Sequence, residues 1–81
     1  MKTRFDMDWQ PFESKLLASS AYDAGKHTLY LRFRNGDVYR YFELSPEQYR
    51  DFLNAESRGR YFLSHIRNHF RYERLAKLQA A

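Results

Sequence analysis

Residues 28–43 read TLYLRFRNGDVYRYFE, two alternating runs on either side of Asn35-Gly36. An Asn-Gly pair between such runs is the strongest short-range signal for a β-hairpin with a two-residue type I′ turn. The predicted strands are Thr28 to Arg34 and Asp37 to Glu43. This hairpin is the most informative element of the sequence, because its register fixes where the neighbouring side chains point.

The register assigns the side chains to two faces of the sheet, because cross-strand partners share a face and successive residues alternate. With Arg34 opposite Asp37 and Tyr30 opposite Tyr41, one face is apolar apart from Arg40. It comprises Leu29, Leu31, Phe33, Val38 and Phe42. The other face, here called the predicted tyrosine–arginine face, comprises Tyr30, Tyr39, Tyr41, Arg32, Arg34 and Asp37. We expect the apolar face in the core and the tyrosine–arginine face outward.

Segments on both sides of the hairpin predict one more strand and two helices. The strand is expected over Lys15 to Asp23. A helix is expected to begin at Ser45-Pro46-Glu47-Gln48, which supplies an N-cap, a first-turn proline and a capping box, and to run to about Ala55. A second helix is expected over Tyr61 to His69, continuing toward Leu78. This order predicts an α+β fold, a three-stranded antiparallel meander followed by two helices packed on one sheet face.

Length and composition fit one small domain. The chain has 81 residues, of which we expect 1–12 to form an N-terminal extension and 13–81 to form the domain. The absence of cysteine excludes disulfides and Cys-based zinc sites and leaves seven Phe, seven Tyr and one Trp to fill the core. No signal peptide or bilayer-spanning run is recognised, so we expect a cytoplasmic protein without membrane contacts.

An ordered series of residues resembles the KTSC domain family. The series is Tyr22-Asp23, Leu29-x-Leu31-x-Phe33, Gly36-x-x-Tyr39-x-Tyr41, Ser45-Pro46, Tyr49, Ala55-x-Ser57-x-Gly59-x-Tyr61-Phe62 and Ile66-Arg67. The family is named for the C-terminus of some lysyl-tRNA synthetases and also occurs as small stand-alone bacterial proteins. Its hallmark is the tyrosine-x-tyrosine centre. Two pairs depart from its usual pattern: Ser20-Ala21 stands where an apolar residue and glycine are usual, and Ser45-Pro46 follows Leu44 where Val-Pro is common. The family's function is not established, but its association with a synthetase implies RNA binding.

The predicted tyrosine–arginine face is typical of a nucleic-acid platform. Single-stranded bases stack on sheet-borne aromatic rings while nearby arginines meet phosphates. On this reading the contacts come from Tyr30, Arg32, Arg34, Tyr39 and Tyr41. The alternative is that the tyrosines pack on one another, or under Trp9 and Phe12 of the N-terminal extension, and only stabilise the sheet.

A second basic surface is expected on the last helix. Its arginines recur at helical spacing on one stripe: Arg60, Arg67, Arg71 and Arg74. Such a stripe is able to follow a phosphate backbone, and the formal net charge of +4 and sequence pI near 9.6 suit an anionic partner. The alternative is an ordinary solvated helix face.

The residues favour binding over catalysis. No nucleophile–base pair, phosphate-cradling glycine loop or metal-ligand set is recognised, and His65 with His69 lacks a third ligand. We therefore expect no enzyme activity, no cofactor, no metal and no small-molecule substrate. The function predicted from the sequence is binding of RNA or single-stranded nucleic acid. The alternative is a protein–protein interaction or homodimerisation through the same face.

Overall fold

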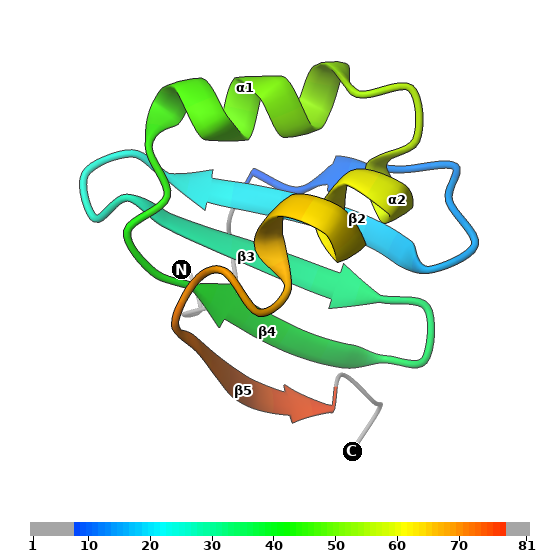
Figure 1. The fold of residues 1–81 in the computed structure, drawn as a ribbon. Coiled ribbons are helices and arrows are strands. Elements are labelled where there is room, and N and C mark those ends of the chain that lie inside the picture. The colour runs from blue at the N-terminus through cyan, green and yellow to red at the C-terminus, as the bar shows by residue number, and fades with distance from the viewer. Residues whose placement is uncertain (1–7, 78–81) are drawn as a thin grey trace.

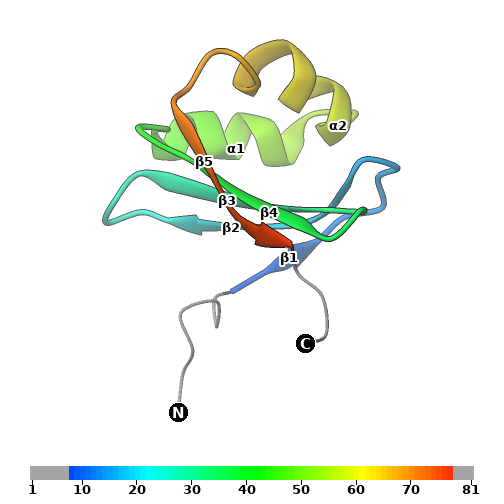
Figure 2. The ribbon, with the colours of Figure 1, turned by 90° about the horizontal axis from the view of Figure 1, so that it is seen from below.

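The structure, a computed structural model, describes residues 8–77. These residues form a five-stranded antiparallel sheet in the order β1-β2-β3-β4-β5, with all helices on one face (Figures 1 and 2). The strands are β1 Gln10–Pro11, β2 Leu17–Asp23, β3 Thr28–Phe33, β4 Asp37–Tyr41 and β5 Tyr72–Lys77. The helices are α1 Pro46–Asn54, α2 Arg58–Tyr61 and the π-helix η1 Phe62–Ile66. Among the described helices, none has the length and apolar character needed to cross a bilayer.

The predicted α+β class and the helices on one sheet face are confirmed, but the meander has five strands instead of three. The short strand β1 pairs with β2 from residues expected to be an extension. The strand β5 pairs with β4 where a continuing helix was expected. Each added strand extends the meander at one edge, so the sheet is wider than the sequence predicts.

The continuation of the second helix toward Leu78, which itself lies outside the described residues, is wrong. The helical segment ends at Ile66, Arg67 is extended, and Asn68 takes a positive φ of 69°, which turns the chain back toward the sheet. Tyr72 and Arg74 then face Tyr41 and Tyr39 across the β4–β5 ladder. The hydrogen bonds of this ladder pair the backbone N–H and C=O groups along the edge of β4. This tertiary pairing overrides the local helical periodicity.

The β3–β4 loop contains three residues, Arg34, Asn35 and Gly36, instead of two. The Gly36 N–H donates to the Phe33 carbonyl at 2.9 Å, and Gly36 has a φ of 97°. A type I′ turn requires positive φ at both Asn35 and Gly36, but only Gly36 has it. The predicted two-residue turn is therefore wrong, and the loop has the three-residue form closed by a left-handed glycine.

This longer loop shifts the register by one residue. The observed pairs are Leu29–Tyr41, Tyr30–Arg40, Leu31–Tyr39 and Arg32–Val38. A one-residue slip moves every side chain of a strand to the opposite face. Tyr39 and Tyr41 therefore lie on the helix-covered face, whereas Val38, Arg40 and Phe42 lie on the other face. The predicted assignment of β4 is wrong, while that of β3 is confirmed.

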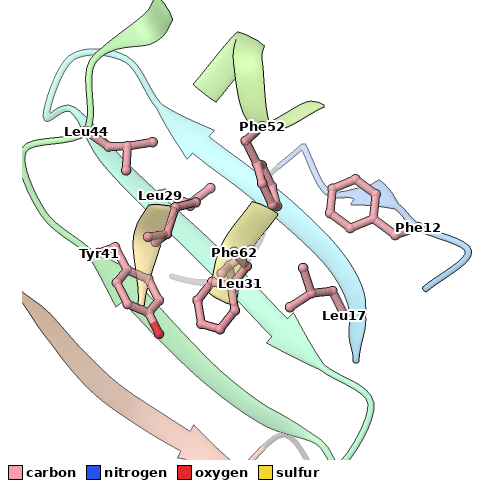
Figure 3. Packing of buried hydrophobic residues seen from close by; sticks show 9 residues of the cluster. Phe12, Leu17, Leu29, Leu31, Tyr41, Leu44, Phe52 and Phe62 are labelled. Carbon is pink, nitrogen blue, oxygen red and sulfur yellow. The ribbon is translucent and has the colours of Figure 1, made fainter. Parts of the chain in front are cut away.

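The core lies between the sheet and the helices (Figure 3). Its buried members are Phe12, Leu17, Leu29, Leu31, Tyr41, Leu44, Phe52, Phe62 and Ile66. Phe52 from α1 meets Phe12 edge-on with ring centroids 5.6 Å apart. Phe62 from η1 meets Tyr41 edge-on at the same separation. Aromatic contacts of this kind let a chain of this size close a core without disulfides.

The start of α1 confirms the predicted capping box. The Gln48 N–H donates to Ser45 Oγ at 3.1 Å, and the Ser45 N–H donates to Gln48 Oε1 at 2.8 Å. Two of the N–H groups that lack an intrahelical partner near the helix start are satisfied in this way, and Pro46 in the first turn has no N–H to satisfy. The helix ends at Asn54, close to the expected Ala55.

The loop geometry predicts that Gly36→Ala destabilises the protein. A side chain at a φ of 97° is strained, so the free energy of unfolding should fall by about 1–2 kcal/mol. Gly25→Ala is the matched control, because a Cβ there meets Asp23 Oδ1 at an ordinary 3.5 Å. Urea unfolding measures both variants. Equal stability of Gly36→Ala and Gly25→Ala would contradict the three-residue loop.

Candidate ligand-binding groove

A groove of about 300 Å³ opens on the helix-covered face, between η1 and strands β4 and β5. We call it the tyrosine groove. Its apolar lining comprises Leu16, Phe33, Tyr39, Tyr41, Phe62, Leu63 and Tyr72. Its polar lining comprises Asn35, Asp37, Arg67 and Asn68. Aromatic and aliphatic side chains together with a few convergent polar groups are characteristic of ligand sites.

Three tyrosine rings from two neighbouring strands form one wall of the groove. Tyr39 and Tyr41 alternate along β4, and Tyr72 lies opposite Tyr41 on β5. The ring centroids are 5.6 Å apart for Tyr41 and Tyr72, 5.7 Å for Tyr39 and Tyr72, and 6.3 Å for Tyr39 and Tyr41. Tyr72 is 56% exposed, whereas Tyr41 is 4% exposed. The wall therefore has a buried inner ring, that of Tyr41, and an accessible outer ring, that of Tyr72.

Tyr41 connects the core to the groove. Figure 3 shows its ring beside Leu29, with the hydroxyl pointing away from Leu29 and Leu44. Burial raises the pKa of Tyr41, and the neighbouring phenols of Tyr39 and Tyr72 raise it further, while Arg67 opposes them. Tyr41 is therefore a neutral phenol at physiological pH and is able to donate a hydrogen bond.

The π-helix η1 places the groove's only described arginine. The Arg67 N–H donates to the Phe62 carbonyl at 2.8 Å, five residues back, which is the hydrogen bond of a π turn. This wide turn keeps Phe62 and Ile66 in the core while Leu63 and Arg67 reach the groove. Short π-helices occur frequently at functional sites. Asn68, with a φ of 69°, follows at once and also lines the groove.

Asp37 is the acidic residue of the groove and is 9% exposed. Its N–H donates to Asn35 Oδ1 at 2.9 Å, and Asn35 Nδ2 donates to Asp37 Oδ2 at 3.3 Å. The other carboxylate oxygen, Oδ1, is buried without a hydrogen-bond partner in the described structure. The loop that sets the hairpin register thus also holds a carboxylate in the wall of the groove.

The predicted platform is divided between two faces. Tyr39 and Tyr41 line the tyrosine groove, but Tyr30 and Arg32 lie on the opposite face of the sheet. There the Arg32 guanidinium lies 4.3 Å from the centroid of the Trp9 ring. The single tyrosine–arginine face is therefore wrong, because the register shift separates the tyrosines of β4 from the arginine of β3.

Arg34 has a structural contact in place of the predicted ligand contact. Its Nε donates to the Ser14 carbonyl at 2.9 Å, and its Nη2 donates to the Phe12 carbonyl at 2.7 Å. The side chain therefore ties the hairpin loop to the segment that carries Phe12 into the core.

The predicted arginine stripe is also wrong, because its four members do not share a helix. Arg60 lies in α2, Arg67 follows η1, Arg71 precedes β5, and Arg74 lies within β5. The Arg71 guanidinium lies 4.7 Å from the centroid of the Phe42 ring. Arg67 lines the groove, and the exposed Arg74 shares the face of its cross-strand partner Tyr39.

Sequence reasoning missed Tyr72, Phe33 and the polar residues Asn35, Asp37 and Asn68 as site residues. Tyr72 was assigned to a helix, where it had no relation to Tyr39 or Tyr41. In the described residues no three metal-ligating side chains gather, and His65 stacks on Tyr61 with ring centroids 4.5 Å apart. The spacing of Tyr39 and Tyr41 was the one sequence signal that pointed to the groove.

The raised pKa of Tyr41 predicts a loss of stability at alkaline pH. A group that holds its proton more tightly when folded stabilises the protein below its unfolded pKa of about 10, and this contribution is lost as the pH rises toward the folded pKa. Tyr41→Phe should therefore lose less stability than the unsubstituted protein between about pH 8 and about pH 11. Urea unfolding across this range measures the difference. Tyr30→Phe, which removes a phenol from the opposite face of the sheet, is the control, and identical pH profiles for all three proteins would contradict the prediction.

The contacts of Arg34 predict a stabilising role. Arg34→Ala removes two hydrogen bonds to carbonyl groups and should lower the free energy of unfolding by about 1–2 kcal/mol. Arg50→Ala, on the exposed side of α1, removes the same charge and should leave the free energy of unfolding nearly unchanged. An unchanged stability of Arg34→Ala in urea unfolding would show that these bonds contribute nothing.

Comparison with known proteins places the fold in a family. The KTSC domain model matches residues 13–70. The crystal structure of a KTSC domain protein from Yersinia pestis superposes with a TM-score of 0.83 at 28% identity, covering 86% of this chain and 99% of that one.

Two curated relatives extend the comparison. A protein of Tsukamurella paurometabola is 40% identical over 62 residues, which are 76% of this chain and 92% of that protein. A lysine–tRNA ligase of Nostoc punctiforme is 33% identical over 64 residues, which are 79% of this chain but only 11% of the ligase. The chain thus corresponds to a small part of the ligase and to nearly all of the shorter relative. The chain belongs to the KTSC domain family.

Proposed function

We propose that this domain binds single-stranded RNA and takes one unstacked base into the tyrosine groove. The observation that carries the proposal is the wall formed by Tyr39, Tyr41 and the exposed Tyr72 beside the guanidinium of Arg67. A base that stacks on an aromatic side chain gains about 1–3 kcal/mol. A groove of about 300 Å³ is at the small end of ligand sites and suits one flat ring system.

The charges around the groove suit the phosphates of the same strand. Arg67 lines the groove, and Arg74 is exposed on the same face of the edge strand β5. The formal net charge of +4 adds a general attraction for an anionic polymer. We therefore assign the base to the tyrosine wall and the neighbouring phosphate to these two arginines.

The family context and the groove's chemistry support binding of RNA without catalysis. A segment similar to this domain occurs in lysine–tRNA ligases, which are named for a tRNA substrate. None of the described lining residues of the groove is a serine, cysteine, histidine or lysine, so the carboxylate of Asp37 has no such partner there with which to form a nucleophile–base pair. The proposed role is recognition, with chemistry left to other proteins or domains.

A protein partner is the second candidate, and a specific feature favours it. Strand β5 is an edge of the described sheet and begins with the exposed Tyr72, and the exposed Leu63 of η1 lines the same groove. An extended segment of another chain, or of a second copy, is able to add to such an edge and place a side chain in the groove. The molar mass from light scattering distinguishes a homodimer from a monomer.

RNA binding is tested by fluorescence anisotropy with a labelled single-stranded RNA at several salt concentrations. Tyr72→Ala should weaken binding about ten-fold, because it removes the exposed stacking ring. Arg67→Ala should reduce the slope of log affinity against log salt by about 1, the change expected for one lost phosphate contact.

Two controls lie away from the groove. Tyr30→Ala removes a tyrosine from the opposite face of the sheet, and Arg50→Ala removes an arginine from α1. Both variants should keep the affinity of the unsubstituted protein within a factor of about two. Unchanged affinity in folded Tyr72→Ala, or no binding at low salt, would contradict the proposed function.

A further inference from the structure

We propose that the tyrosine groove selects guanine among the bases, through the carboxylate of Asp37. This inference rests on the proposed RNA binding and adds the identity of the bound base. Its starting point is Asp37, the one acid among the described residues that line the groove, where the other polar groups are phenols, amides and a guanidinium. An acid is unfavourable in a site for a polyanion unless it has a specific partner.

The hydrogen bonding of Asp37 leaves acceptor capacity unused. Oδ2 accepts from Asn35 Nδ2 at a long 3.3 Å, and Oδ1 is buried without a partner in the described structure. A carboxylate only accepts hydrogen bonds, and a buried oxygen without one costs free energy. A ligand that brings N–H donors to this carboxylate therefore removes a cost that the unbound protein carries.

Guanine is the base whose edge matches two carboxylate oxygens. Its Watson–Crick edge presents two adjacent donors, N1–H and the N2 amino group. Adenine and cytosine present one amino group beside a ring nitrogen acceptor, and uracil presents one N–H between two carbonyl oxygens. In those three bases an acceptor faces the carboxylate and repels it. Bases in single-stranded RNA are read on this edge.

The surroundings of Asp37 are arranged for a base that enters edge first. Asp37 begins β4, and Tyr39 follows on the same face of the same strand, so the ring wall continues from the carboxylate. Leu63 and Tyr72 are 48% and 56% exposed, and such side chains are free to change rotamer as a base enters. Arg67 lines the same groove and offsets the repulsion between Asp37 and the phosphates of the strand.

The test uses anisotropy with five labelled RNA heptamers that are identical uridine strands except at the central position. That position carries guanosine, inosine, adenosine, cytidine or uridine. Guanosine should bind at least about ten-fold more tightly than adenosine, cytidine or uridine. Inosine lacks the N2 amino group but keeps N1–H, so its affinity should fall between guanosine and the others.

Asp37→Asn should abolish the preference for guanosine. The amide replaces one acceptor oxygen with an NH2 donor, and this donor faces a donor of guanine. Asp51→Asn, an exposed carboxylate on α1, makes the same charge change and should keep the preference. Circular dichroism checks that both variants fold. If Asp37→Asn does not fold, the comparison of guanosine with inosine in the unsubstituted protein decides.

The outcomes separate this inference from the proposed function. Equal affinity for all five heptamers, with binding still weakened by Tyr72→Ala, would overturn guanine selection and leave RNA binding in place. A preference that survives in folded Asp37→Asn would also overturn it. Failure of every heptamer to bind at low salt would overturn the proposed function, and guanine selection with it.

Discussion

The hydrogen bond from the Gly36 N–H to the Phe33 carbonyl closes the loop on which both faces of the sheet depend. It fixes a three-residue connection, and the connection fixes the register of β4 against β3. Through that register Tyr41 enters the core beside Leu29, and Tyr39 and Tyr72 form the outer part of one aromatic wall. Asp37, held by Asn35 of the same loop, takes its place at the end of that wall. Core, groove and acid are thus consequences of one local geometry.

Where structure is determined locally, the sequence predicts it well. The start of α1 depends on contacts within four residues, from Ser45 to Gln48, and its capping box forms as predicted. The existence of the hairpin is likewise predicted by Asn35-Gly36 and the alternating runs. The loop length is not, because Arg34-Asn35-Gly36-Asp37 is compatible with two or three loop residues. Only the three-residue loop places Tyr41 on the face where it packs against Phe62, and the local sequence holds no information about that contact.

The groove is predicted in part, for the same reason. Tyr39, Tyr41 and Arg67 were named from the sequence, but on surfaces that do not exist in the fold. Tyr72 was missed because the segment after Ile66 has apolar residues at a spacing that fits a helix. Its pairing with Tyr41 as a strand depends on an edge of β4 some thirty residues earlier in the chain, and a local pattern holds no information about such an edge.

Arginines alone do not identify a binding surface, because several of them are engaged by side chains of the protein itself. Arg32 lies over Trp9, Arg71 lies over Phe42, and Arg40 pairs with Glu73 across the β4–β5 ladder. These three cations contact aromatic rings or an acid of the protein itself. The arginines that remain for a ligand are those without such contacts, and Arg67 in the groove is one of them.

The π turn at Phe62–Ile66 has a consequence for how the chain tolerates a change of length. A π turn holds one residue more than an α turn, so a single-residue deletion within this segment restores an ordinary α-helix. After such a deletion the Arg67 N–H still has the Phe62 carbonyl as its partner, now four residues back instead of five, so the residues that follow the turn keep their positions. Residues before the deletion, including Phe62 in the core, keep their positions. The π turn therefore lets this fold hold one residue more or one residue fewer here without moving the segments on either side.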